Sequence, residues 1–299
     1  VMATNVGSAG TMLGNPVGIL IGSRAGLTFE DFMIWSFPVM LLSLTVTVAL
    51  LMVWYRKDIR QLSERMAQRR GHALPLGPTV AVPFKRGLLL ICGTIGLVAL
   101  HHRIELWLDL ETNTVLYMAP LVAAGIVMIW RRERARHYIE QDVEWWTLIF
   151  FLMLFGVAGT LQYTELTTEI AFSLTRLLGD QTSILVPAVM AISAIGSAFI
   201  DNVIFVAAFI PVVQELVGES ATVHPLWWAL LFGACFGGNI TMIGSTANIV
   251  ALGMLEKRYR TRIHFLEWFR VGLAAGFVAG FVAWLALLVT GPFMLAGSS

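Results

Sequence analysis

The chain has 299 residues, of which 57% are hydrophobic and 13% charged, and its mean hydropathy is +0.77. This apolar fraction is far above that of a soluble globular domain, so the composition predicts an all-α polytopic membrane protein. The formal net charge is +1, and no basic stripe alternates with aromatic residues, which excludes a nucleic-acid-binding role.

A short polar stretch interrupts the first apolar segment. It reads Thr-Met-Leu-Gly-Asn-Pro-Val-Gly at residues 11–18, where Pro16 prevents a helix from continuing unbroken. Irregular backbone at membrane depth is tolerated only where protein buries it or where it lines a watery cavity. We therefore expect a broken transmembrane helix, with Asn5, Thr11, Gly14 and Asn15 as site residues. Because Val1 opens the chain directly at this motif, we expect the sequence to begin partway through a longer protein or to be a domain cut from one.

The next segments predict spans separated by charged loops. Residues 33–54 are apolar and long enough to cross a hydrocarbon core of roughly 30 Å, which completes a first region, 1–54. Residues 55–86 are rich in Lys and Arg and are predicted to be a cytoplasmic loop. The region 87–161 is predicted to hold scaffold-like spans at residues 87–107, 115–130 and 145–161.

The last region, 162–299, is predicted to be a second repeat. An amphipathic helix at residues 165–178 is expected on the outer surface. Two apolar arms hinged near residue 201 predict a re-entrant hairpin over 184–217, because each arm is short for a full span. A broken helix over 226–256 and a last span over 267–290 follow.

Basic residues support this topology. Of the 20 Lys and Arg, only Arg24, Arg103 and Arg176 fall outside the segments assigned to the cytoplasm. A hairpin that crossed fully would add one crossing and move the basic residues of 257–262 to the outer face. The charge distribution therefore favours a re-entrant hairpin.

The two breaks are copies of each other. Placing Gly14 on Gly244 aligns Thr-Met-Leu-Gly at 11–14 with Thr-Met-Ile-Gly at 241–244 and places Gly7 on Gly237. Gly-interrupted apolar segments at matching positions in two halves are the best sequence indication of a transporter binding site. The pattern predicts an inverted-repeat transporter.

Asp201 is the one acid deep within an apolar stretch. A charge in the membrane costs at least ~2.5 kcal/mol, so such a residue is a functional candidate by default. A carboxylate can bind a cation or a proton, and exchange between the two is chemically available. The structural alternative is that Asp201 only caps backbone amides at the hairpin tip.

Uncharged polar groups surround the breaks. A broken helix presents free N–H groups to an anion and free carbonyls to a cation, so the site can hold either. The candidate ligands are Asn202, Asn239, Thr241, Ser245, Thr246 and Asn248, with Gly244 allowing close backbone approach. Asp201, Asn202 and Asn248 are candidates for a sodium site. The alternative is that these groups only satisfy unwound backbone. Gly18 stands where the second copy has Asn248, so the first copy lacks one ligand.

Other reactive residues carry no clear signal. Cys92 and Cys235 lie in separate apolar runs and are predicted to be buried free thiols. No His/Glu or Ser/His spacing indicates an enzyme, and no cofactor is expected apart from sodium or a proton as coupling ion. A channel is the other alternative, although duplicated breaks favour alternating access.

The motifs resemble a known family. They are Ala-Thr-Asn-Val-Gly at 3–7 with the first break, Asp-Val-Glu-Trp-Trp-Thr-Leu-Ile-Phe-Phe at 142–151, Ser-Ala-Phe-Ile-Asp-Asn-Val at 197–203, and the second break from Gly237. They resemble the ion transporter superfamily, and specifically its branch of arsenite-efflux permeases and NhaD-type sodium/proton antiporters. The resemblance covers nearly the whole chain.

The resemblance implies a transporter whose two halves each supply a hairpin tip and a broken helix to a central site. It also implies a homodimer in the inner cell membrane that works by an elevator-like movement. We expect secondary-active transport of a small inorganic ion, by arsenite-type efflux or sodium/proton antiport. The alternative is sodium-coupled transport of a di- or tricarboxylate. The Asp-Asn tip at 201–202 favours the first, whereas Pro-Val-Gly at 16–18 departs from the usual Pro-Pro-Asn and leaves the substrate open.

Overall fold

The computed structural model describes residues 1–68, 84–111, 113–143, 163–218, 224–260 and 262–296, together with residues 145, 148, 149, 152, 153, 156, 159 and 160. All regular elements in these ranges are helical, so the predicted all-α class is confirmed. The span predicted at residues 145–161 lies mostly outside the described residues.

The chain divides into two compact units. Unit 1 comprises Val1–Leu51 and Ile149–Ser299, and unit 2 comprises Met52–Leu148. Both breaks and the predicted hairpin belong to unit 1. The elements of unit 1 are α1 (Met2–Gly7), η1 (Ser8–Gly10), α2 (Pro16–Ala25), α3 (Phe29–Asp31), η2 (Phe32–Ser36), most of α4 (Phe37–Trp54), α11 (Leu166–Leu178), α12 (Thr182–Phe199), α13 (Asn202–Val217), α14 (Pro225–Gly237), α15 (Thr246–Tyr259) and α16 (Phe265–Ala296).

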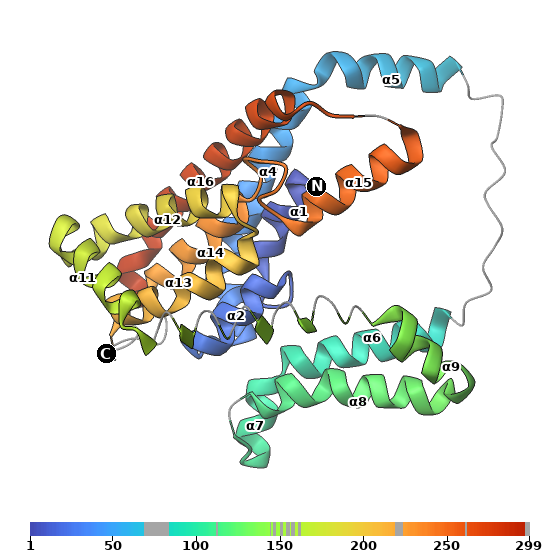
Figure 1. Ribbon diagram of the computed structural model, residues 1–299, viewed down its shortest axis with the longest axis horizontal. Coiled ribbons are helices and arrows are strands. Elements are labelled where there is room, and N and C mark those ends of the chain that lie inside the picture. Colours follow the sequence, from blue (N-terminus) through green and yellow to red (C-terminus); the bar gives the residue numbers. More distant parts are fainter. Residues whose placement is uncertain are drawn as a thin grey trace. The chain divides into compact units, whose positions relative to one another are not determined.

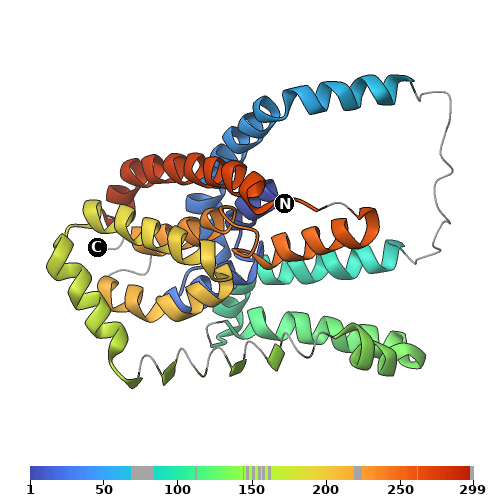
Figure 2. The same ribbon diagram turned by 45° about the horizontal axis from the view of Figure 1, so that its top comes forward.

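Helix α14 forms the centre of unit 1. All of its residues are buried, which is the pattern of a helix that is apolar on every side. Helices α12, α13, α16 and α2 pack against it, and both views show α14 enclosed by these neighbours (Figures 1 and 2). The Trp228 indole meets the Phe32 ring edge to face at 5.0 Å between centroids, which links α14 to the N-terminal segment.

The two broken helices restart in the same way. In the first copy, α1 and η1 lead to non-helical residues 11–15, and α2 begins at Pro16. In the second copy, α14 leads to non-helical residues 238–245, and α15 begins at Thr246. Helix α15 leads away from the packed helices of unit 1 (Figure 1). The breaks therefore bring helix termini of both copies to the interior of one unit.

Long apolar helices complete unit 1. Residues Phe29–Trp54 form one helix of 26 residues with a π-helical turn at Phe32–Ser36. This turn precedes Pro38, which has no N–H to donate to a carbonyl in the preceding turn. Three helices in the described ranges are long and apolar enough to cross a membrane, namely Phe29–Trp54, Thr182–Phe199 and Phe265–Leu295. With 18 residues, α12 reaches this length, so the expectation that both hairpin arms are too short holds only for α13.

Unit 2 contains a bent helix pair. The elements are α5 (Arg56–Gln68), α6 (Phe84–Ala99), α7 (His101–Leu108), α8 (Thr114–Trp130), α9 (Arg132–His137) and η3 (Tyr138–Asp142). Residues 87–107 were expected to be one span, and the structure forms them as two helices, α6 and α7, which meet at an angle of 66°. The His101 ring bonds the Val98 carbonyl at 2.8 Å, and the Glu105 carboxylate accepts from the N–H groups of Asn113 and Val115. The Glu105 bonds hold α7 against the start of α8, and the His101 bond links α7 to the end of α6.

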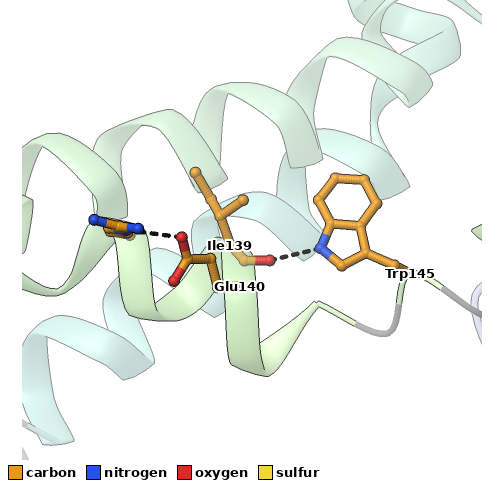
Figure 3. A network of polar contacts seen from close by, with 4 residues as sticks. Ile139, Glu140 and Trp145 are labelled. Carbon is orange, nitrogen blue, oxygen red and sulfur yellow. Dashed lines mark hydrogen bonds and ion pairs between the residues drawn. The ribbon is translucent and has the colours of Figure 1, made fainter.

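A π-helical turn, η3, follows α9 in unit 2. The N–H of Val143 reaches back to the Tyr138 carbonyl, which leaves the Ile139 carbonyl without its usual helical partner. The Trp145 indole N–H donates to that carbonyl at 2.7 Å, and Arg136 pairs with Glu140 on the same turn (Figure 3). The Trp145 indole N–H is therefore part of this turn.

The basic segment 55–86 is not simply a loop. Its first part forms α5, which contains Arg56, Lys57, Arg60 and Arg65, and residues 69–83 lie outside the described ranges.

Candidate ion site

Each break is closed by a glycine and a polar cap. Asn15 Oδ1 accepts the N–H of Gly18 at 2.8 Å and caps α2. Ser245 Oγ accepts the N–H of Ala247 at 3.3 Å and caps α15. Short polar side chains are favoured here because the first N–H groups of a helix have no partner inside it.

The glycines before these caps leave room for the backbone to turn. A Cβ on Gly244 would lie 2.7 Å from the Ser197 carbonyl oxygen and 2.9 Å from that of Gly238. A Cβ on Gly14 would collide with the carbonyl oxygen of Ser8, which is the repeat position of Gly238. The same close approach therefore occurs in both copies.

Asn5 joins the two copies. Its Nδ2 donates to Asn239 Oδ1 at 2.9 Å and to Asn248 Oδ1 at 3.0 Å, and its Oδ1 accepts from Ser245 Oγ at 3.1 Å. All four side chains are buried. The structure thus brings four predicted site residues into one network, which we call the amide cluster: Asn5, Asn239, Ser245 and Asn248.

Asn248 holds the second break in place. Its Nδ2 donates to the Gly238 carbonyl at 2.8 Å and to the Thr241 carbonyl at 3.0 Å. The same side chain accepts from Asn5, so one carboxamide links the loop, α15 and the first copy. At the matching position, a Cβ on Gly18 would lie only 2.7 Å from the Met12 carbonyl oxygen, which explains why the first copy carries no side chain there.

The cap residues also make contacts between the copies. Ser245 donates to Asn5, and Asn15 Nδ2 donates to Cys235 Sγ at 3.1 Å. With the repeat alignment, Asn15 corresponds to Ser245 and Cys235 to Asn5, so each cap contacts the equivalent position in the other copy. Cys235 is a buried free thiol, as predicted, and is also part of the site, whereas Cys92 is exposed and the prediction that it is buried is wrong.

Asp201 lies at two helix N-termini. Its Oδ1 accepts the N–H of Val203 at 3.0 Å at the start of α13. Its Oδ2 accepts the N–H and the hydroxyl of Thr246 at 2.7 and 2.6 Å at the start of α15. The positive ends of two helix dipoles favour a negative charge here. Asp201 is thus a cap, as the structural alternative held, and it also ties the hairpin tip to the second broken helix.

The C-terminal end of α12 and the start of α16 support the second break. The Thr241 hydroxyl donates to the Ala198 carbonyl, and Ser197 Oγ donates to the Ala234 carbonyl at 2.7 Å. From α16, the Trp268 indole donates to the Asn239 carbonyl at 3.1 Å. Sequence reasoning missed Ser197 and Trp268, because nothing in their local patterns indicates which carbonyls they reach.

Not every predicted ligand joins the amide cluster. Thr11 accepts the N–H of Gly14 through its carbonyl at 3.0 Å, so it shapes the first break. Asn202 is buried at the start of α13. For the expected sodium ligands, the described bonds pair Asp201 with Thr246 and Asn248 with Asn5.

The electrostatics of the site come from dipoles and from one carboxylate. Among the described residues, no lysine or arginine is buried, and the amide cluster is neutral. The N-termini of α2 and α15 offer positive dipole ends, and the carbonyls around both breaks offer negative ones. Such an arrangement can hold an ion of either sign without a fixed counter-charge.

Comparison with known proteins identifies the family. A family model described as "Citrate transporter" matches residues 1–233. The chain belongs to the citrate transporter family. This membership places it in the ion transporter superfamily, and it confirms the resemblance at that level.

Individual relatives of this family agree with a membrane carrier. A 46 kDa membrane protein of Mycobacterium leprae (strain TN) is 34% identical over 300 residues, 97% of this chain and 67% of the relative. An uncharacterized transporter of Mycobacterium tuberculosis (strain CDC 1551 / Oshkosh) is 36% identical over 279 residues, 91% of this chain and 62% of the relative. The P protein of Homo sapiens is 36% identical over 169 residues, 50% of this chain and 19% of the relative. The chain spans about two thirds or less of the length of these proteins. It is a multi-pass membrane protein of a transporter family.

Proposed function

We propose that the protein is a secondary-active carrier of a small anion and that it works by alternating access. The amide cluster and the N-termini of α2 and α15 form the substrate site, and Asp201 couples transport to a proton or a sodium ion. The observation that carries the proposal is the binding of the Asp201 carboxylate by the N-terminus of α15, with hydrogen bonds of 2.6 and 2.7 Å to Thr246.

This contact suggests how coupling works. While Asp201 is ionised, it occupies the N–H and hydroxyl groups of Thr246 that an anionic substrate needs. A protonated Oδ2 is a poor acceptor for these donors, so proton uptake frees the helix N-terminus. A bound sodium ion would likewise draw the carboxylate away. Substrate and coupling cation therefore bind together, which is the requirement for symport.

The first candidate substrate is an organic carboxylate. The α15 N-terminus binds the carboxylate of Asp201, so its geometry suits that group, and the family carries the description of a citrate transporter. These observations rank a di- or tricarboxylate above the inorganic ions that the Asp-Asn tip favours.

The second candidate is a small inorganic ion, by arsenite-type efflux or sodium/proton antiport. It is supported by the neutral oxygens of the amide cluster and by the lack of a buried lysine or arginine among the described residues. A homodimer with an elevator-like movement fits either candidate, with the sodium ligands then coming from Asp201, Asn202 and Asn248.

Flux in proteoliposomes tests the proposal. The purified protein is reconstituted, and uptake of citrate, succinate and arsenite and exchange of sodium for protons are measured under imposed gradients. We expect saturable, gradient-driven carboxylate flux that Asp201→Asn abolishes and that Glu215→Gln, an exposed change on the same helix, leaves intact. Flux of arsenite or sodium alone would replace the first candidate by the second. Ohmic, non-saturating current would overturn the carrier itself.

A further inference from the structure

Helix α5 begins directly where a transmembrane helix ends. The apolar helix Phe29–Trp54 is long enough to cross the bilayer, and α5 starts at Arg56 after a one-residue turn at Tyr55. The N–H of Ile59 donates to the Tyr55 carbonyl at 2.9 Å, so the first turn of α5 begins immediately after Tyr55. Trp and Tyr are enriched at the membrane–water interface, and here Trp54 and Tyr55 mark that level. Helix α5 therefore starts at the membrane surface.

One side of α5 is an exposed apolar stripe. Ile59, Leu62 and Met66 recur at the spacing of one helix face. They are 48%, 59% and 64% exposed, although residues of these types are usually buried. Exposing three large apolar side chains to water is unfavourable, so we expect the stripe to contact an apolar partner.

Charges on α5 are arranged around this stripe. At about 100° per residue, Arg56 and Arg65 flank it on opposite sides, each roughly 90° from its centre. Lys57 and the ion pair of Arg60 with Glu64, 3.1 Å apart, lie on the far face. Long basic side chains at the edges of an apolar face can extend to lipid phosphates while their stems stay in the apolar layer.

We propose that α5 is an in-plane surface helix that docks on anionic phospholipid of the leaflet at its end of α4. The stripe enters the boundary between headgroups and acyl chains, and Arg56 and Arg65 bind lipid phosphates. A lipid occupant is favoured by the continuity with a membrane-crossing helix. It is also favoured by charge, because α5 contains four basic residues and only two acidic ones, Asp58 and Glu64. This inference is independent of the transported substrate.

The proposal predicts a graded dependence on lipid charge. Each basic residue at an anionic surface shifts docking about fivefold toward the bound form. Replacing Arg56 and Arg65 by glutamine therefore weakens docking by about 25-fold in anionic membranes and has little effect in zwitterionic ones.

Site-directed fluorescence tests the docking in the whole protein. A Cys92→Ser background keeps the buried Cys235, and an environment-sensitive probe is attached through Met66→Cys in the stripe or Lys57→Cys on the far face. The unlabelled background controls for labelling at Cys235. Each protein is placed in nanodiscs of phosphatidylcholine, with or without phosphatidylglycerol, and quenching by brominated acyl chains is measured.

The expected result is strong quenching at position 66, weak quenching at position 57, and an increase at position 66 with phosphatidylglycerol that Arg56→Gln with Arg65→Gln removes. Equal weak quenching at both positions would mean a water-exposed helix and overturn the proposal. A shielded position 66 without quenching would mean that protein covers the stripe and would overturn it as well.

Discussion

Asn5 Nδ2 donates a hydrogen bond to Asn248 Oδ1 across 3.0 Å, although 243 positions separate the two residues. The bond joins the first half of one broken helix to the second half of the other. Asn248 in turn holds the loop of the second break through the carbonyls of Gly238 and Thr241. A movement of one copy against the other must therefore break or remake this contact.

Asn5→Ala should lower both stability and transport. It removes the donor to Asn239 and Asn248 and the acceptor of Ser245, and each orphaned buried polar group costs about 1–3 kcal/mol. Thermal unfolding in detergent and flux in proteoliposomes measure the two effects. The exposed Thr45→Ala on α4 serves as control and should change stability by less than about 0.5 kcal/mol. An Asn5→Ala protein with unchanged melting temperature would contradict a structural role for the amide cluster.

Gly244→Ala should be damaging, whereas Gly253→Ala should be harmless. The new Cβ at 244 would lie 2.7 Å from the Ser197 oxygen and 2.9 Å from the Gly238 oxygen, both on backbone that other bonds hold. At 253, inside α15, a Cβ meets nothing within 4 Å, so alanine should raise helix stability by up to about 1 kcal/mol. Melting temperatures of the two variants, compared with that of the parent, test this contrast. Equal effects would mean that the break does not need its glycine.

Asp201 and Thr246 should be energetically coupled. In a double-mutant cycle with Asp201→Asn and Thr246→Ala, we expect a coupling free energy of about 1 kcal/mol, because Thr246→Ala removes the hydroxyl bond and Asp201→Asn replaces its charged acceptor by a neutral one. Thr246→Ser keeps the hydroxyl and should behave like the parent. Unfolding measurements in detergent provide the four free energies. Strict additivity would show that the bond contributes nothing in solution.

Glu105→Gln should open the start of α8 locally. The Glu105 carboxylate is buried and accepts N–H bonds from Asn113 at 3.0 Å and Val115 at 2.8 Å. Bonds to a charged acceptor are worth about 1.5–3 kcal/mol, and an amide that presents its N–H₂ group loses one of them. Hydrogen exchange at residues 113–115 should accelerate, whereas the exposed Glu111→Gln should leave it unchanged. Unchanged hydrogen exchange in the Glu105→Gln protein would show that the Glu105 carboxylate does not hold the start of α8.

We expect the free energy of unfolding to decrease at acidic pH because His224 becomes protonated. This residue precedes α14, its Nδ1 accepts the N–H of Leu226 at 3.2 Å, and burial lowers the pKa of the imidazole below 6.5. The unfolded state therefore binds a proton more readily than the folded state. The contribution of neutral His224 to the stability of the folded state is complete above pH 6.5. It is lost as the pH falls from 6.5 through the lowered pKa of the folded state.

The measurement is the melting temperature between about pH 7.5 and pH 5, compared with that of His224→Asn. Asparagine keeps a capping acceptor without titrating in this range, so its curve should be flatter than that of the parent. Parallel curves would exclude His224 as the source.

The local patterns of the sequence determined the class of protein and the kind of site. Apolar segments of spanning length require helices, because lipid leaves no other way to pair backbone groups. The pairs Gly14–Asn15 and Gly244–Ser245 indicate breaks, because each helix must restart with a flexible residue and a polar cap. The repeat follows from comparing these short stretches, and none of this depends on knowing what touches what.

Tertiary structure alone decided which groups meet. Asn5 and Asn239 are equally polar in the sequence, but their pairing depends on α14 packing beside α1 across 234 positions. The same holds for Cys235, which becomes a partner of Asn15, and for Asp201, whose second helix is α15. The bend between α6 and α7 could not be predicted from the local sequence either, because the residue between the two helices is Leu100 and not a proline or a glycine. Composition and spacing are properties of neighbouring residues, whereas a hydrogen bond depends on distances that only the packed chain sets.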